Sequence, residues 1–242
     1  FKRAKKFIKI IKIMEKLMNK IRIIEVKESI FKSNNNEASL LRNDLKEKGT
    51  FLLNLMSSPG SGKTTLLTKL LPILKKNFKI GVMEADIDSD VDACTINNLG
   101  IDVIQLHTGG MCHLDAHMTR QGIDNLGNND YDFLVLENVG NLVCPAEFDT
   151  GSIENMTILS VPEGDDKPLK YPLMYEVCDI VVINKVDVLP YFDFNKEKAV
   201  NNILMRNEKA KIFFVSSKTG DGIEDLAKYL KEDIIEFKKE SK

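Results

Sequence analysis

A nine-residue stretch, SSPGSGKTT (57–65), limits the fold more than any other part of this sequence. It follows an apolar run, FLLNLM (51–56), and precedes a helical pattern, TTLLTKLLPILKK (64–76). Backbone N–H groups of a glycine-rich turn between a strand and a helix can surround phosphate oxygens, and the helix dipole adds to the attraction. Ser57 stands where such loops usually begin with glycine, which is a mild departure. We expect six consecutive residues to bind phosphates, with Lys63 on the outer phosphates and the Thr64 hydroxyl on Mg²⁺: Gly60, Ser61, Gly62, Lys63, Thr64 and Thr65.

The rest of the chain alternates apolar runs with amphipathic helical patterns. The apolar runs are 51–56, 80–84, 101–106, 132–138, 156–161, 179–184 and 211–216. The helical patterns include 64–76, 90–100, 113–123, 197–207 and 223–239. Near-continuous apolar strands separated by such helices are typical of a parallel sheet covered on both faces. We predict an α/β fold of the P-loop NTPase class, a doubly wound, mostly parallel sheet of about seven strands, with ligands at the carboxyl ends of the strands.

Two later motifs indicate which base the nucleotide carries. NKVD (184–187) ends an apolar run and supplies Asn184, Lys185 and Asp187. An Asp carboxylate there accepts both the N1–H and the 2-amino group of guanine, whereas adenine would leave it unpaired, so we predict GTP and GDP as ligands. SSKTG (216–220) resembles a further guanine-contacting loop, through Ser216, Ser217 and Lys218.

Acidic residues follow two other predicted strands, where phosphate-bound Mg²⁺ would lie. Asp86 follows the second strand and Glu137 ends the fourth, and we expect both to act on Mg²⁺ or its waters. Asp92 is an alternative candidate for polarising the attacking water. Asp88 and Asp90 are interpreted as helix caps.

The chain concentrates cysteine and histidine in MCHLDAHM (111–118). Cys112 and His113 are predicted to head a helix, with His117 four residues beyond His113 on the same face, and Cys144 follows Glu137 by seven residues. Thiolate and imidazole are preferred ligands of Zn²⁺ and Ni²⁺. We predict that these four residues bind nickel or zinc, within one subunit or between two. The remaining cysteines, Cys94 and Cys178, are expected to be core residues.

Charge, hydropathy and cysteine content restrict the possible partners and cellular location of the protein. The net charge of −2 gives no electrostatic case for nucleic acid, and no apolar run is long enough to span a bilayer. The four cysteines form no disulfide framework, so a reducing, cytoplasmic setting is expected. Residues 1–37 are predicted to be a basic N-terminal extension and linker, in part upstream of the natural start, and residues 38–242 a GTPase domain. The polar stretch SNNNEAS (33–39), around this boundary, is interpreted as the linker.

Seven motifs follow one another along the chain: SSPGSGKTT, EADIDSDVDA, HTGGMCHLDAHM, LENVGNLVCPAEFD, SVPEGDDKPLKYP, NKVDVLPY and SSKTGDG. In this order they resemble the HypB family of GTPases, and the resemblance runs from about residue 38 to 232. HypB belongs to the branch of the SIMIBI GTPases that is marked by the glutamate in ENVG. Residues 1–50 contain no Cys or His, so the N-terminal nickel site of many members is missing from that segment.

This resemblance implies a metallochaperone that assists nickel insertion into [NiFe]-hydrogenase, with slow intrinsic GTP hydrolysis because no arginine finger stands in the motifs. It also implies a GTP-dependent homodimer, with Lys170 reaching the other nucleotide, and as partners a HypA-like maturation protein and the hydrogenase large subunit. Two alternatives remain open, a urease-type accessory GTPase similar to UreG and a metal-storage scaffold with a vestigial nucleotide site.

Overall fold

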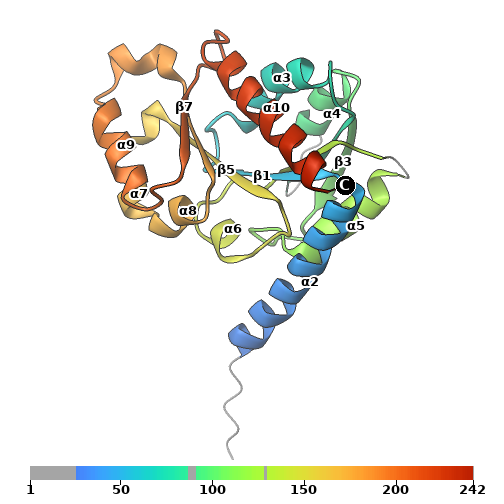
Figure 1. Ribbon diagram of the computed structural model, residues 1–242. Coiled ribbons are helices and arrows are strands. Elements are labelled where there is room, and N and C mark those ends of the chain that lie inside the picture. Colours follow the sequence, from blue (N-terminus) through green and yellow to red (C-terminus); the bar gives the residue numbers. More distant parts are fainter. Residues whose placement is uncertain (1–25, 87–90, 128–129, 242) are drawn as a thin grey trace, which may run out of the picture. The chain divides into compact units, whose positions relative to one another are not determined.

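The seven predicted strands are all present in a single sheet. The computed structural model describes residues 26–86, 91–127 and 130–241, and Figure 1 labels many of its helices and strands. The strands are β1 (Phe51–Ser57), β2 (Ile80–Asp86), β3 (Asp102–His107), β4 (Phe133–Glu137), β5 (Glu154–Ser160), β6 (Ile180–Asn184) and β7 (Lys211–Phe214). Their order across the sheet is β3-β2-β4-β1-β5-β6-β7, and every pairing is parallel. The predicted fold class is confirmed.

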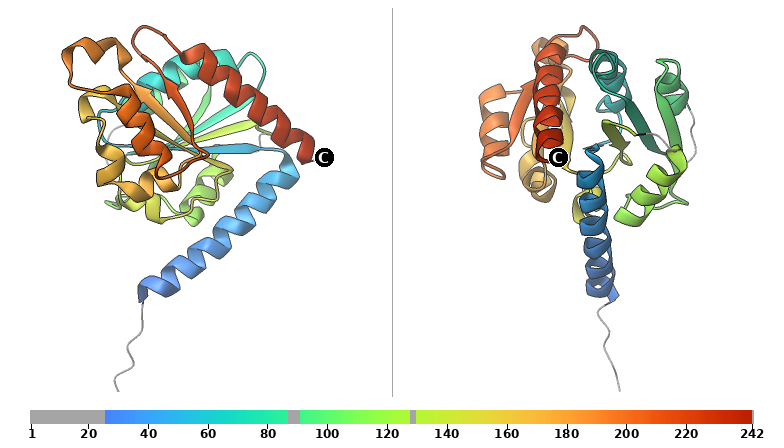
Figure 2. Two further views of the ribbon diagram at one scale, coloured as in Figure 1. Left: turned by 60° about the vertical axis from the view of Figure 1, so that its left-hand side comes forward. Right: turned by 45° about the vertical axis from the view of Figure 1, so that its right-hand side comes forward.

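Side chains alternate between the two faces of this sheet, as the strand period of two requires. On β1, Leu53 and Leu55 pack in one apolar cluster with helices α3 (Lys63–Leu74) and α10 (Ile223–Glu240). Leu52 and Met56 belong to clusters on the opposite face. Figure 2 shows helices covering both faces. With neither face open to water, the strands read as continuous apolar runs, and this is why the sequence predicted them well.

The structure describes further helices and two 3₁₀ turns. The other helices are α2 (Val26–Lys48), α4 (Val91–Asn97), α5 (Ala116–Leu126), α6 (Cys144–Glu147), α7 (Lys167–Lys170), α8 (Pro172–Glu176) and α9 (Lys196–Leu204), with 3₁₀ turns η1 (Val161–Glu163) and η2 (Val186–Tyr191). Among the described residues, no helix combines the length and the apolarity needed to cross a membrane. Residues Asn34–Lys242 form one compact unit.

The predicted polar linker over 33–39 is wrong, because this segment lies inside helix α2. Asn34 is buried; its Nδ2 donates to the carbonyl oxygen of Asp149 at 2.9 Å, and its Oδ1 accepts from the N–H of Ala116 at 3.0 Å. Ala38 is buried as well. The asparagines that suggested a solvated linker therefore include one that bonds to two distant backbone groups.

Candidate functional site

The glycine-rich stretch connects β1 to α3 at the carboxyl edge of the sheet, as predicted. Gly60 and Gly62 have φ values of 73° and 102°, which favour glycine. A Cβ on Gly62 would lie 2.7 Å from Nδ2 of Asn184, so a larger residue there would collide with the neighbouring loop. At the unusual first position, Ser57 is fully buried and its hydroxyl donates to the carbonyl oxygen of Ser58. The serine is thus accommodated without opening the turn.

Two residues of the NKVD motif donate hydrogen bonds to backbone carbonyls of this loop. Asn184 donates from Nδ2 to the carbonyl oxygen of Ser61 at 2.9 Å, and Lys185 donates from Nζ to that of Gly60 at 2.6 Å. Lys185 has a φ of 64°, unusual for a residue with a side chain, and backbone strain of this kind gathers at binding sites. The NKVD motif therefore helps to fix the shape of the phosphate loop.

A cavity of about 230 Å³ lies between the two motifs. Asp187 lines it, and its Oδ1 accepts from the Ser216 hydroxyl at 2.7 Å. Ser217 donates to Oδ1 of Asn184 from both its backbone N–H and its hydroxyl. The predicted binding residues that line the cavity are Gly62, Thr65, Asn184, Lys185, Asp187, Ser217 and Lys218. An acceptor carboxylate facing a cavity next to a phosphate loop suits a guanine base.

The expected magnesium side of the site is formed by α3 and β4. The Thr64 hydroxyl donates to Oε1 of Glu137 at 3.1 Å, and Glu137 is buried at the end of β4. A hydroxyl and a carboxylate held this close are oxygen donors of the kind that Mg²⁺ prefers. Asp86 ends β2, but its side chain lies outside the described residues, as do Asp88 and Asp90. Asp92 lies in the first turn of α4. Lys170, on α7, forms an exposed ion pair with Asp166 at 2.6 Å.

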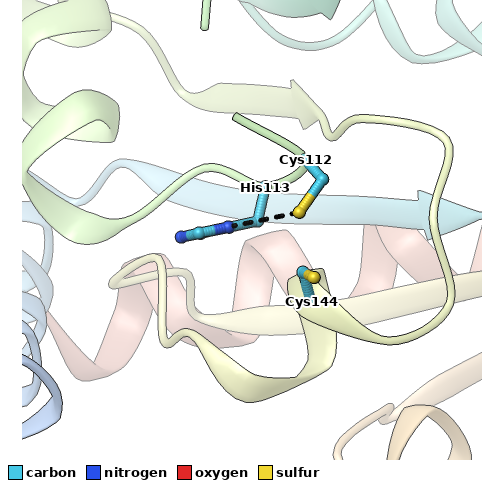
Figure 3. A group of neighbouring side chains, drawn as sticks. All are labelled: Cys112, His113 and Cys144. Carbon is cyan, nitrogen blue, oxygen red and sulfur yellow. Dashed lines mark hydrogen bonds between the residues drawn. The ribbon is translucent and has the colours of Figure 1, made fainter. Parts of the chain in front are cut away.

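Three of the four predicted metal ligands converge (Figure 3). One ligand atom from each of Cys112, His113 and Cys144 lies within 4.8 Å of the others. Cys112 and His113 come from the loop after β3, while Cys144 begins α6, a few residues after β4. Segments far apart in the sequence therefore bring two thiols and an imidazole together, and this donor set fits a zinc or nickel ion.

The fourth predicted ligand, His117, is not in this group. Its Nε2 lies 3.1 Å from Nε2 of Gln121 instead. The prediction placed His113 and His117 on one helical face, but α5 begins only at Ala116, where Asp115 is the N-cap and accepts from the N–H of Met118. His113 thus lies in the loop before the helix, and the spacing of four residues does not bring the two rings together.

The environment of two of these candidate ligands, Cys112 and His113, affects their protonation. The neighbouring Cys144 thiol, through a side-chain hydrogen bond, raises the pKa of Cys112, and desolvation adds to this. Desolvation lowers the pKa of His113, whose ring stacks on Phe148 with centroids 3.8 Å apart and an interplanar angle of 18°. Both shifts favour neutral ligands while no cation is bound. Nothing in the sequence pointed to Phe148, since the contact depends on how α6 ends.

The expectation for the other two cysteines is half right. Cys178 is fully buried as predicted. Cys94 is exposed, because the buried positions of α4 are Ala93 and Ile96 and Cys94 lies on the other side of the helix. All four cysteines are free thiols.

Sequence reasoning also missed two asparagines in the segment after β4. The side chain of Asn138 is fully buried, and its Oδ1 accepts from the N–H of Leu114 at 3.3 Å. Asn141 donates from Nδ2 to the carbonyl oxygen of Cys112 at 3.3 Å. Both connect the segment that begins at Glu137 to the loop of Cys112 and His113. Only the pairing of the two loops, which the sequence does not show, reveals these contacts.

The fold, with a glycine-rich phosphate loop between a central parallel strand and a helix, defines a P-loop NTPase. Comparison with known proteins agrees: residues 51–214 match the family model described as the CobW/HypB/UreG nucleotide-binding domain. The hydrogenase maturation factor HypB of Rhizobium leguminosarum bv. viciae is 43% identical over 213 residues, which cover 88% of this chain and 71% of that protein. The hydrogenase/urease maturation factor HypB of Helicobacter pylori (strain J99) is 39% identical, covering 86% of this chain and 87% of that protein.

A solved structure is similar over nearly its full length. The crystal structure of HypB from Helicobacter pylori in complex with nickel superposes with a TM-score of 0.77 at 38% identity, covering 84% of this chain and 96% of that one. The chain belongs to the HypB family.

Proposed function

We propose that the chain is a GTP-hydrolysing metallochaperone, which holds nickel or zinc at Cys112, His113 and Cys144 and assists nickel insertion into [NiFe]-hydrogenase. The observation that carries this proposal is the convergence of those three ligand atoms within 4.8 Å. Cys144 is joined to Glu137 by only six intervening residues. Support comes from the relatives named hydrogenase maturation factors and from the nickel complex of the Helicobacter pylori protein.

In the proposed reaction the chain's own groups position GTP and balance its charge. Lys63, at the start of α3, would place its ammonium on the outer phosphates, and the Thr64 hydroxyl and the Glu137 carboxylate, together with Asp86, would hold Mg²⁺. Mg²⁺ supplies neutralisation of the charge that develops on the phosphates. Asp92 is the candidate for polarising the attacking water. Loss of the γ-phosphate then releases the segment after Glu137, which alters the geometry between Cys112 and Cys144.

Completion of the metal site by a second subunit is part of the proposal. Within the described part of the chain three candidate ligands converge, while structural zinc sites are usually four-coordinate. Met111 and Val143, beside the ligands, are 42% and 51% exposed, and exposed apolar residues around a cluster of thiols suit a face that another copy covers. In a GTP-dependent homodimer, Lys170 would exchange its partner Asp166 for the other subunit's nucleotide. The proposal includes a cytoplasmic location, a HypA-like maturation protein and the hydrogenase large subunit as partners.

A second client is favoured by one comparison. The relatives from Helicobacter pylori are named hydrogenase/urease maturation factors. The same chain serving urease as well as hydrogenase would use the same metal site. Deleting the gene in its own organism and measuring nickel content in both enzymes distinguishes one client from two.

We call the proposed dependence of metal binding on the bound nucleotide the metal switch. It is tested by calorimetric titration of Ni²⁺ and of Zn²⁺ into the protein loaded with GDP or with a non-hydrolysable GTP analogue. Coupling between two sites is typically about 5–150-fold in affinity, and we expect a difference in that range. Cys112→Ala and Cys144→Ala should each remove most of the metal binding and leave GTP affinity nearly unchanged. His117→Ala is the matched control and should bind metal as the parent does. Equal metal affinity in the two nucleotide states would refute the switch.

A further inference from the structure

One short segment contacts both the nucleotide site and the metal site. At its start, Glu137 accepts from the Thr64 hydroxyl. Three residues on, a Cβ added to Gly140 would lie 3.2 Å from the Cα of Pro59, so the segment packs tightly on the phosphate loop. At its end, Asn141 donates to the carbonyl oxygen of Cys112. Residues 137–141, the bridging segment, are therefore in a position to respond to both ligands.

Within the bridging segment, Asn138 has the most restricted side chain. It is fully buried and makes three hydrogen bonds. Its Oδ1 accepts from the backbone N–H of Leu114 at 3.3 Å and from that of Val139 at 2.9 Å. Its Nδ2 donates to Oδ1 of Asn54 at 3.1 Å. Since Asn54 belongs to β1, the strand that leads into the phosphate loop, one carboxamide connects three segments of the molecule.

Because the Asn138 carboxamide is buried, it has little freedom to change its hydrogen-bond partners. Asn54 is itself 1% exposed and donates from Nδ2 to Oδ1 of Asn155 on β5, so the amide chain continues across the sheet. Water cannot replace a bond that Asn138 loses, and an unpaired buried polar group is costly. A shift of Glu137 that also displaces Asn138 would therefore either move Leu114 or leave a buried amide unpaired. Leu114 directly follows His113 and is only two residues after Cys112.

We propose that Asn138 is the positioning residue through which the nucleotide state at Glu137 sets the placement of Cys112 and His113. The inference rests on the proposed metal switch and identifies the side chain that connects the nucleotide site to the metal site. It requires no ligand contact by Asn138, which touches neither the thiols nor the hydroxyl of Thr64 by any described hydrogen bond. Its effect is expected in the coupling between the sites, while the affinity of each ligand measured alone should change little.

The test is the ratio of Ni²⁺ affinities in the GDP and GTP-analogue states, measured for the parent and for two variants. Asn138→Ala removes all three bonds of the buried amide and should reduce a parent ratio of about 5–150 to within about twofold of unity. Asn141→Ala is the control, because it deletes a solvent-exposed hydrogen bond from the same segment to the metal loop, made by a half-buried side chain. It should keep most of the parent ratio. Nucleotide affinity and circular dichroism of both variants report whether the fold and the GTP site persist.

The outcomes separate this inference from the proposed function. If the parent shows no nucleotide dependence, the switch and the inference both fail. A parent with dependence that Asn138→Ala retains overturns the inference alone, and so does equal loss in both variants. Should Asn138→Ala not fold, hydrogen exchange of the Leu114 amide in the unmodified protein decides the question: its rate should change when GDP is replaced by the GTP analogue, and an unchanged rate would contradict the role of Asn138.

Discussion

At the scale of single residues, Asp187 makes the most specific chemical demand on the ligand. Its carboxylate lines the cavity beside the phosphate loop, and the Ser216 hydroxyl donates to Oδ1. Two hydrogen bonds from guanine to a charged acceptor, at about 1.5 kcal/mol each, predict that Asp187→Asn weakens GTP binding about 100-fold. The new amide can donate to the 2-oxo group of xanthine, so affinity for xanthosine triphosphate should rise.

Equilibrium binding of fluorescent GTP and xanthosine triphosphate measures both changes. Asp221→Asn is the matched control, since Asp221 is an exposed carboxylate in the neighbouring loop that accepts from the Thr219 hydroxyl. Unchanged GTP affinity in Asp187→Asn would show that the base lies elsewhere.

The residues of the candidate site were predictable from sequence to different degrees. Cys112 and His113 are neighbours in the chain, and Cys144 was grouped with them because of the family resemblance and because it follows a predicted strand. The sequence did not show the strand order, in which β2 lies between β3 and β4. His117 was misplaced because the N-cap at Asp115 starts α5 later than expected. Phe148 and Asn138 were missed, since a ring stack and a buried amide contact depend on loop geometry that no spacing in the sequence encodes.

At the scale of elements, α2 shows why polar composition was misleading. Its asparagines predicted a linker, but side chains of α2 from Asn34 onward make hydrogen bonds and ion pairs with residues far away in the sequence. Arg42 donates to the carbonyl oxygen of Ser152 and pairs with Asp149 at 2.6 Å. Arg120 of α5 pairs with Glu37 and Asp44. Tertiary contacts of this kind override the local preference of asparagine for turns and caps.

These contacts predict that Asn34→Ala destabilises the protein. The substitution leaves the Ala116 N–H and the Asp149 carbonyl without their buried partner, and each such loss costs about 1–3 kcal/mol. We expect the free energy of unfolding, measured in urea, to fall by at least about 1 kcal/mol. Asn36→Ala, two residues on and exposed, is the control and should change stability little. Equal effects of the two substitutions would mean that Asn34 acts only through helix propensity.

At the scale of the whole molecule, the strands were the most predictable part, because a sheet buried on both faces requires unbroken apolar runs. Those runs end in polar residues at one edge: Ser57, Glu137 and Asn184 close β1, β4 and β6. The phosphate loop, the candidate magnesium residues and the cavity proposed for the base all lie at this edge because the strands are parallel. At the other ends of the strands, their amino ends, lies a group of acidic residues that no sequence pattern indicated.

That group lies at the amino ends of β5 and β6, where Glu154 begins β5 and Asp179 precedes β6. Burial, followed by a hydrogen bond with Asp233 of α10, raises the pKa of Glu154 to about 9 from an ordinary 4.5. Burial also raises the pKa of Asp179. Tyr229, on the same helix as Asp233, has its pKa raised by burial and by these acids.

Glu154 should therefore make stability depend on pH. Between pH 4.5 and about 9 the folded protein keeps a proton on Glu154 that the unfolded chain has lost, so the stabilisation present below pH 4.5 is lost as pH rises toward 9. Glu154→Gln cannot ionise, and its stability relative to the parent should increase by at least about 1 kcal/mol between about pH 5 and 9, the equivalent of one pKa unit. Urea unfolding at both pH values measures this difference, with Glu232→Gln, an exposed carboxylate of α10, as the control. A parent and a Glu154→Gln variant that lose stability in parallel would place the pH dependence in other groups.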